Sequence, residues 1–195
     1  MESRVAASLA TLTACEWDAL VPDGALFLRH AFLAGLEQSG CIAAETGWES
    51  AHVLLTDAQG LAAAAPAYLK THSYGEFVFD FSWAQAYARA GLEYYPKLVV
   101  AVPFTPATGP RLLVRPGLDP VTLKRRLLVR LAALARERGA SSAHVLFPDD
   151  ADTAALDEAG WLGRRDCQFH WHNRGYTAVD HYLAGFTADT RKEAR

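Results

Sequence analysis

The chain has 195 residues, of which 51% are hydrophobic and 21% charged, a composition typical of a folded globular protein of one domain. A net charge of −3 gives no overall attraction to nucleic acid, although a local basic strip remains compatible with it. The apolar runs are shorter than the roughly 18–20 residues of a membrane span. The first residues, Met-Glu-Ser-Arg-Val, also lack the order of a secretory signal. We therefore expect a soluble, cytoplasmic protein.

The first forty residues are predicted to form two helices. Thr13 and Glu16 have the spacing of a capping box, in which a hydroxyl and a carboxylate bind opposite backbone amides at a helix start. This first helix should run to residue 20. Apolar residues at helical spacing over 27–36, followed by Gly40, indicate the second helix.

A β-hairpin is expected next. Residues 52–56 and 61–69 read as its two strands, joined by a turn over 57–60. The second strand carries Pro66, a residue that a central strand does not readily accept.

The middle of the chain alternates helix and strand. Ser82 and Gln85 have capping-box spacing and predict a helix that ends at Gly91. Residues 97–102 and 112–114 are apolar or β-branched and predict two strands, with a proline-rich loop between them.

A long helix should begin at Asp119, with proline in its first turn, and end at Gly139. Its apolar stripe indicates a face that packs on the core. Its other faces carry basic residues, which suit either a solvated surface or a phosphate or tRNA contact. The stripe comprises Leu123, Leu127, Leu131 and Leu134, and the basic residues are Lys124, Arg125, Arg126, Arg130, Arg136 and Arg138.

The last third is predicted to hold a strand at 143–147, a helix at 153–159, a long strand at 162–173 and a helix capped by Asp180. Together these elements predict an α+β fold with a mixed sheet. The cysteines Cys15, Cys41 and Cys167 are odd in number and far apart, so we expect reduced, buried thiols.

Hydrogen-bonding and titratable residues are unusually dense between residues 70 and 111. Glu76 stands among aromatic residues, where partial burial would raise its pKa and suit a general base. Alternatively, Glu76 pairs with Lys97 or Arg111 and holds two loops together. Asp80 is expected to be a turn or cap residue. The whole set is His72, Ser73, Tyr74, Glu76, Asp80, Lys97, Thr105, Thr108 and Arg111.

A second group of interest is the pair His170 and His172. On a strand they would share one face, opposite Cys167 and Trp171. The two histidines could form a structural layer of hydrogen-bonded side chains, or they could bind substrate or transfer a proton. With His72 or Glu76 as a third ligand, they could also hold a metal ion for hydrolysis.

Four ordered blocks resemble the bacterial-type FemAB-like family of N-acyltransferases, which is labelled for peptidoglycan biosynthesis or recognition. The blocks are His72-Ser-Tyr-Gly-Glu-Phe-Val-Phe-Asp80, Tyr94-Tyr-Pro-Lys-Leu98, Val102-Pro-Phe-Thr-Pro-Ala-Thr-Gly-Pro-Arg111 and Gln168-Phe-His-Trp-His-Asn-Arg-Gly175. The resemblance implies the GNAT fold of acyl-CoA N-acyltransferases. It also implies a GNAT-like domain over 1–179, with 180–195 starting a linking helix toward a second GNAT-like half.

The activity implied is transfer of an acyl or aminoacyl group to an amine, on a small molecule or a peptide-like peptidoglycan precursor. Acyl-CoA or aminoacyl-tRNA would be the co-substrate, with no permanently bound cofactor and no metal. We expect Glu76, His170, His172 and Tyr74 to be catalytic. The expected substrate contacts are His72, Ser73, Lys97, Thr105, Thr108, Gly109, Arg111, Asn173 and Arg174.

The sequence departs from the usual acetyl-CoA site. Prolines at 103, 106 and 110 remove backbone donors, and Asp119 already places a negative charge at the helix start. The alternative is a non-catalytic GNAT-like half that binds a ligand or pairs with a second copy or half-domain. For the catalytic hypothesis, Glu76, the loop before Arg111 and the two histidines must line one cleft.

Overall fold

A computed structural model describes residues 1–193. The chain divides into two compact units, Met1–Leu162 and Gly163–Arg195. This division falls before the boundary at residue 179 that we predicted. The linking helix toward a second half stays a prediction, and residues 194 and 195 of that segment lie outside the described residues.

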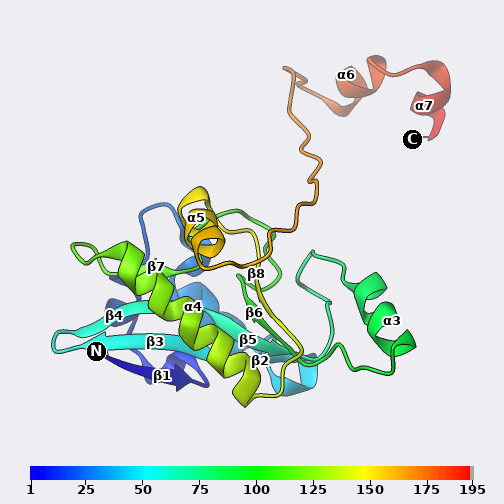
Figure 1. Cartoon of the computed structure of the whole chain (residues 1–195). Helices are drawn as coiled ribbons and strands as arrows, with labels where there is room; N and C mark the ends of the chain where they lie inside the picture. The colour runs from blue at the N-terminus through cyan, green and yellow to red at the C-terminus, as the bar shows by residue number, and fades with distance from the viewer. Residues whose placement is uncertain (194–195) are drawn as a thin grey trace. The chain divides into compact units, whose positions relative to one another are not determined.

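Two four-stranded sheets form the centre of the first unit (Figure 1). The first has the order β1-β3-β4-β7, and all its pairs are antiparallel. The second has the order β2-β5-β6-β8, and only its β6–β8 pair is parallel. The strands are β1 (Glu2–Ala6), β2 (Trp48–Ser50), β3 (His52–Asp57), β4 (Gly60–Ala65), β5 (Ala67–Lys70), β6 (Lys97–Val100), β7 (Leu113–Val114) and β8 (Ala143–Val145).

The chain passes from one sheet to the other at Ala51 and at Pro66. The predicted hairpin forms as β3 and β4, but its second arm, expected as one strand over 61–69, is broken at Pro66, which lies between the end of β4 at Ala65 and the start of β5 at Ala67 in the second sheet. Because proline has no amide hydrogen, it interrupts the ladder there. Its carbonyl still accepts a hydrogen bond from Ala101 N at 3.2 Å.

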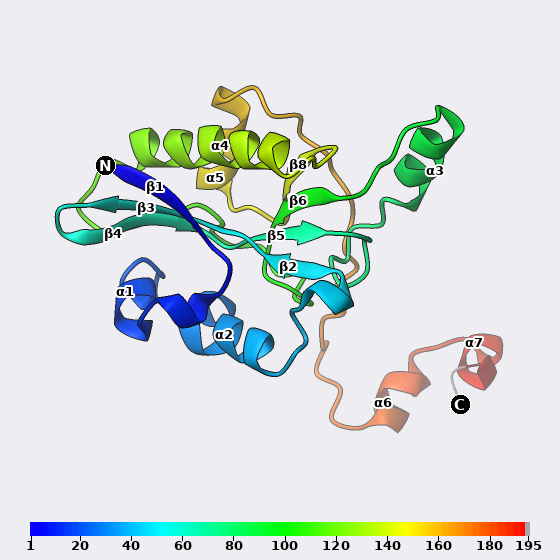
Figure 2. The same ribbon diagram turned by 90° about the horizontal axis from the view of Figure 1, so that it is seen from below.

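Helices cover both faces of the first sheet, as Figure 2 shows. α4 lies on one face, and α1 and α2 lie on the other. α3 projects from the sheets in both views and has no buried residue. The helices are α1 (Ala14–Asp18), α2 (His30–Gln38), α3 (Phe81–Arg89), α4 (Pro120–Glu137) and α5 (Asp150–Glu158), with 3₁₀ turns at Leu9–Thr11, Leu26–Leu28 and Ala44–Thr46.

The predicted leucine stripe of α4 is confirmed. Leu123, Leu127, Leu131 and Leu134 are all buried in the core that α4 forms with the sheet. Full burial of each leucine contributes about 1.5–3 kcal/mol, so this face anchors the helix. The Thr13–Glu16 capping box of α1 is also confirmed, as is Asp119 as the N-cap of α4.

Several local predictions are wrong. The first forty residues include strand β1, which is short and polar, and β2 was also not predicted. α3 begins at Phe81, so Ser82 does not cap it, and α5 begins at Asp150 rather than 153. No strand forms over the described residues 162–173, because a strand needs a pairing partner and alternation alone does not supply one. All three cysteines are free but exposed rather than buried.

The second unit contains two short helices, α6 (Val179–Ala184) and α7 (Ala188–Glu193). The helix predicted near Asp180 is therefore present, but its N-cap is Ala178 and Asp180 lies in its first turn. None of the helices within residues 1–193 is both long and apolar enough to span a bilayer.

Glu37 joins α2 to three other elements. One carboxylate oxygen accepts hydrogen bonds from Ser50 Oγ (2.6 Å) and His52 Nε2 (2.9 Å), and the other from Ser8 Oγ (2.7 Å) and Leu9 N (2.9 Å). Burial alone would raise the pKa of Glu37, but the hydrogen bonds from His52, Ser50 and Ser8 outweigh it and lower the pKa to about 2.

We expect Glu37→Gln to reduce the free energy of unfolding by roughly 2–3 kcal/mol at pH 7. A folded-state pKa below the unfolded value stabilises the protein above about pH 4.5, and this contribution is lost as the pH falls toward about 2. Urea unfolding at a series of pH values should therefore show the two proteins converging in acid. Glu45→Gln, at an exposed position, is the control. A difference that stays constant with pH would contradict this role.

Candidate active site

Two buried lysines face each other on neighbouring strands of the second sheet. Lys70 ends β5 and Lys97 begins β6, and the antiparallel register pairs them directly. Both are 0% exposed. Like charges opposite each other in a sheet are destabilising, so nearby groups must compensate. The compensation comes from the loop that joins β5 to α3.

Lys97 is held by two carboxylates of this loop. Its Nζ lies 2.7 Å from Glu76 Oε2, and it forms a second, shorter ion pair with Asp80. It also donates to Ser73 Oγ at 3.2 Å. The predicted structural pairing of Glu76 with Lys97 is therefore confirmed, whereas Arg111 does not take part in it. Asp80 occupies the N-cap position of α3, but its side chain forms no cap hydrogen bond.

Glu76 has one oxygen without a hydrogen-bond partner. Its Oε1 is buried and unpartnered among the described residues, while Oε2 binds Lys97. Burial raises the pKa of Glu76, and the adjacent Lys97 only partly opposes this. A carboxylate with a raised pKa and a free lone pair is a stronger proton acceptor than an exposed one.

Lys70 is a buried residue of the candidate site that sequence reasoning missed. Its Nζ lies 3.6 Å from the centre of the Trp48 ring and donates to Tyr74 O at 3.1 Å. Burial lowers the pKa of Lys70 to about 7; Glu76 opposes this shift and Lys97 adds to it. The only sequence signal was a lysine at the end of an otherwise apolar strand.

The proline-rich loop before Arg111 is fixed from within. Arg111 is 1% exposed, and its guanidinium donates to Ala107 O (2.5 Å), Leu146 O (2.9 Å) and Pro110 O (3.0 Å). Burial lowers the pKa of Arg111 to about 10, against the charge of Asp152. Because backbone carbonyls take up its donors, Arg111 positions the loop in this conformation.

The proline-rich loop before Arg111 contacts the turn that carries Glu76. Phe104 N donates to Gly75 O at 3.0 Å, and a side chain on Gly75 would lie 2.6 Å from the Phe104 ring. Thr105 bonds to Pro103 O within its own loop, and Thr108 is exposed. Gly109 N donates to Phe147 O, which ties the loop to the segment after β8.

Aromatic side chains surround this turn on the outside. Tyr74, Phe77 and Phe79 are 66%, 50% and 60% exposed, in the loop that carries Glu76. The Tyr74 ring lies 5.8 Å from Phe81 and 5.2 Å from His72. His72 Nδ1 accepts from Tyr74 N at 3.2 Å, and burial lowers the pKa of His72. Exposed rings beside buried charges are a common setting for ligand contacts.

The remaining predicted site residues belong to the second unit. His170 is exposed and contacts Gln168, and His172 is exposed as well. Asn173 accepts from Gly175 N and Tyr176 N, as a turn residue does, and Arg174 is exposed. The shared strand face predicted for the histidines is wrong, because the segment forms no strand. Within residues 1–193, no group of three or more His, Cys, Asp or Glu is placed to hold a metal ion.

Comparison with solved structures identifies the fold. An aminoglycoside antibiotic 6'-N-acetyltransferase from Acinetobacter haemolyticus, in its apo form, aligns with a TM-score of 0.51 and 11% identity, over 89% of this chain and 99% of that one. A probable acetyltransferase aligns with a TM-score of 0.46 and 16% identity, over 91% and 100% of the two chains. The first likeness defines a GNAT fold, as the resemblance predicted.

The family follows from the sequence comparison. Residues 8–195 match the FemAB-like family, described as peptidoglycan biosynthesis/recognition, and the chain belongs to this family. No curated protein matches the chain.

We expect Lys97→Met to lower the free energy of unfolding by about 3–5 kcal/mol, because it removes the cation that two buried carboxylates share. Denaturant unfolding at pH 7 measures this. Arg89→Met, at an exposed position on α3, is the control and should change the stability by less than about 0.5 kcal/mol. A loss below about 1 kcal/mol for Lys97→Met would show that the carboxylates are hydrated or protonated instead.

Lys70 should make the stability rise with pH. Its folded-state pKa of about 7 lies below the unfolded value of 10.5, so the unfolded chain binds more protons between these values. Between pH 7 and 9.5, we expect the wild type to gain about 1–3 kcal/mol relative to Lys70→Met. Urea unfolding across this range measures the difference. Parallel curves for the two proteins would mean that Lys70 keeps an ordinary pKa.

Proposed function

We propose that this chain is an N-acyltransferase that passes an acyl or aminoacyl group to an amine on a peptidoglycan precursor or a similar peptide-like molecule. Family membership and the GNAT fold support the reaction class. The observation that carries the proposal is the buried Glu76 carboxylate, which has one oxygen on Lys97 and one without a partner.

The reaction needs only one base and one acid. The amine nitrogen forms a bond to the acyl carbon, the bond from that carbon to the donor's leaving atom breaks, and the ammonium proton must leave. Glu76 Oε1 would accept this proton, and the Tyr74 hydroxyl would protonate the leaving atom. Lys97 would keep the carboxylate oriented, so no covalent enzyme intermediate is required.

The other predicted residues have proposed supporting roles. His72, Ser73, Thr105, Thr108 and Gly109 lie in the same two loops as Glu76 and Arg111, and would contact substrate. Ser73 is 0% exposed and bonds to Lys97 and to the Tyr95 hydroxyl, so it would reach substrate only if the loop over residues 71–80 opens. The roles of His170 and His172 in proton transfer, and of Asn173 and Arg174 in binding, stay predictions, as does the cytoplasmic location.

The co-substrate is proposed to be acyl-CoA or aminoacyl-tRNA. The start of α4 does not offer free amides to a pyrophosphate group, because Asp119 caps it and accepts a hydrogen bond from Val121 N at 3.1 Å. An acyl-CoA would therefore be held differently from the usual glycine-rich loop. Its phosphates would need side-chain cations instead.

One observation favours the alternative of a non-catalytic, ligand-binding or dimerising half-domain. The side chain of Glu76 is 0% exposed. No predicted site residue lines the larger cavity described in the next subsection or a smaller one, of about 280 Å³, beside Glu37 and Trp48. An amine can reach Oε1 only if the loop over residues 71–80 rearranges. Catalysis by this chain therefore requires that donor or acceptor binding opens this loop.

Ligand-induced stabilisation and turnover together test the proposal. Acetyl-CoA, a long-chain acyl-CoA or charged tRNA, at saturation, should raise the melting temperature of the wild type, because a ligand that binds only the folded state stabilises it. With the donor so identified and a panel of amines, Glu76→Gln should lower kcat by about 10²–10⁴ while keeping the shift in melting temperature.

The control is Glu93→Gln, at an exposed position, which should leave kcat unchanged. If none of the three donors stabilises the wild type, the half-domain alternative is favoured. If Glu76→Gln retains full turnover, the base lies elsewhere.

A further inference from the structure

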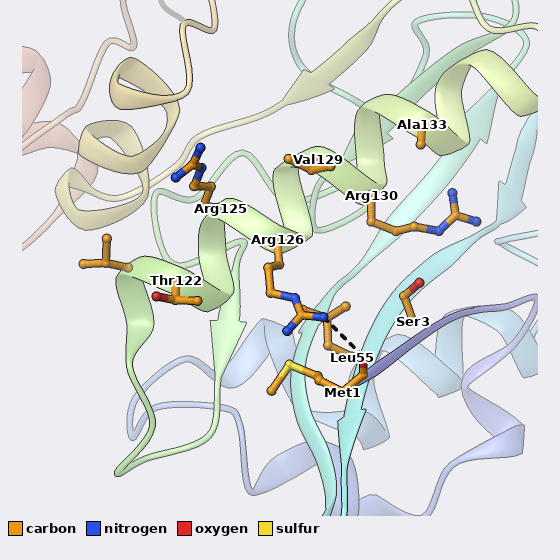
Figure 3. A pocket seen from close by; sticks show the side chains of 10 residues that line it. Met1, Ser3, Leu55, Thr122, Arg125, Arg126, Val129, Arg130 and Ala133 are labelled. Atoms are coloured by element: carbon orange, nitrogen blue, oxygen red, sulfur yellow. Dashed lines mark hydrogen bonds between the residues drawn. The ribbon is translucent and has the colours of Figure 1, made fainter.

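The larger of the two cavities described in the first unit lies outside the candidate active site. It has a volume of about 510 Å³, within the range of small-molecule sites. We call it the α4 groove. Figure 3 shows it between one side of α4 and the strands that carry Ser3 and Leu55. Its lining residues are Met1, Ser3, Leu55, Val121, Thr122, Arg125, Arg126, Val129, Arg130 and Ala133.

The charge of the groove is opposite to that of the whole chain. Three of its ten lining residues are arginines and none is acidic, in a protein of net charge −3. Arginine stays charged at any working pH and matches phosphate oxygens with paired donors. The groove is therefore a local site of positive potential.

The two arginines that point along the groove each have a partner that a ligand would displace. In Figure 3, Arg126 extends toward Met1, and one of its nitrogens donates to Met1 O at 3.2 Å. Arg130 pairs with Glu137 at 2.9 and 3.0 Å, but the Glu137 side chain is 56% exposed. The Arg130 side chain is 21% exposed and its contact with Glu137 is bidentate, so a phosphate has to compete with the Glu137 carboxylate for Arg130, whereas at Arg126 it displaces one bond to a backbone carbonyl.

The groove also has an apolar component. Val129 lies between Arg126 and Arg130 along α4 and is 65% exposed, and Val121 is 62% exposed. Leu55 of β3, which is 2% exposed, also lines it. Exposed valines next to arginines are suited to a molecule with an apolar body and an anionic end.

We propose that the α4 groove binds a phosphate-bearing amphiphile, with the phosphate on Arg126 and Arg130 and the aliphatic chain along Val121 and Val129. This site is separate from the proposed acyl-transfer chemistry, because it shares no residue with the Glu76 cluster. Such a ligand can be a free molecule or the headgroup of a lipid in a membrane surface.

The probe is dodecyl phosphate below its micelle concentration, titrated into the full chain by calorimetry. We expect saturable binding with one site, and a Kd at least tenfold higher for the double variant Arg126→Ala/Arg130→Ala. Arg136→Ala on the same helix but outside the groove is the matched control and should bind like the wild type. Circular dichroism of each variant confirms that the fold is kept.

Two related probes separate the contributions of the ligand's parts. Dodecanol lacks the anion and inorganic phosphate lacks the chain, so each should bind at least tenfold more weakly than dodecyl phosphate. Val129→Asp, which adds a charge at an exposed position, should also weaken binding at least tenfold. Equal affinity of the wild type and the double variant, or no binding of dodecyl phosphate, would overturn the proposal.

Vesicles distinguish the source of the phosphate. If the wild type, but not the double variant, sediments with phosphatidylcholine vesicles that contain phosphatidic acid, the ligand is a lipid headgroup. If dodecyl phosphate binds and vesicles do not, it is a free molecule. Vesicle binding that persists in the double variant, without binding of monomeric dodecyl phosphate, would show nonspecific adsorption and reject the groove as a site.

Discussion

The direct opposition of Lys70 and Lys97 inside the second sheet constrains everything around it. Neither ammonium group reaches water, and the register holds them on paired positions of β5 and β6. Two sets of contacts compensate the buried charges. Glu76 and Asp80 form ion pairs with Lys97, and the Lys70 ammonium lies over the Trp48 ring. The loop between β5 and α3 is thus held by charge rather than by apolar burial, which leaves its aromatic residues free to face solvent.

A second ionic centre holds the opposite side of the candidate site. Asp152 of α5 accepts from Arg111 N (2.5 Å) and Leu112 N (3.0 Å) and pairs with Lys124 of α4 at 2.7 Å. One carboxylate therefore joins two helices to the chain just before β7. Since breaking a buried pair costs several kcal/mol, Asp152 fixes the proline-rich loop at its Arg111 end. Opening the segment over residues 71–80 would likewise have to break, or move together with, the pairs of Lys97 with Glu76 and Asp80.

Patterns that depend on local geometry could be predicted from the sequence. The leucine stripe of α4 and the cap at Asp119 each follow from one residue type in one conformation. The pairing of Glu76 with Lys97 was also foreseen, because both carry charge in apolar surroundings. By contrast, the strand expected over 162–173 had alternating side chains from Cys167 on but no partner strand, and the environment of Lys70 depends on the residue opposite it, Lys97. Pairing between strands is not determined by local residue patterns, so it could not be predicted from the sequence.

The two cationic sites of the first unit use their side chains in opposite ways. Lys70 is buried, and its pKa of about 7 lets it lose its proton near neutral pH. The groove arginines line a cavity at the surface, where their paired donors can bind an anion. Lysine in the sheet and arginine on α4 are therefore not interchangeable. An arginine at position 70 would place a permanent charge opposite Lys97, and a lysine at 126 would lose the paired donors that fit a phosphate.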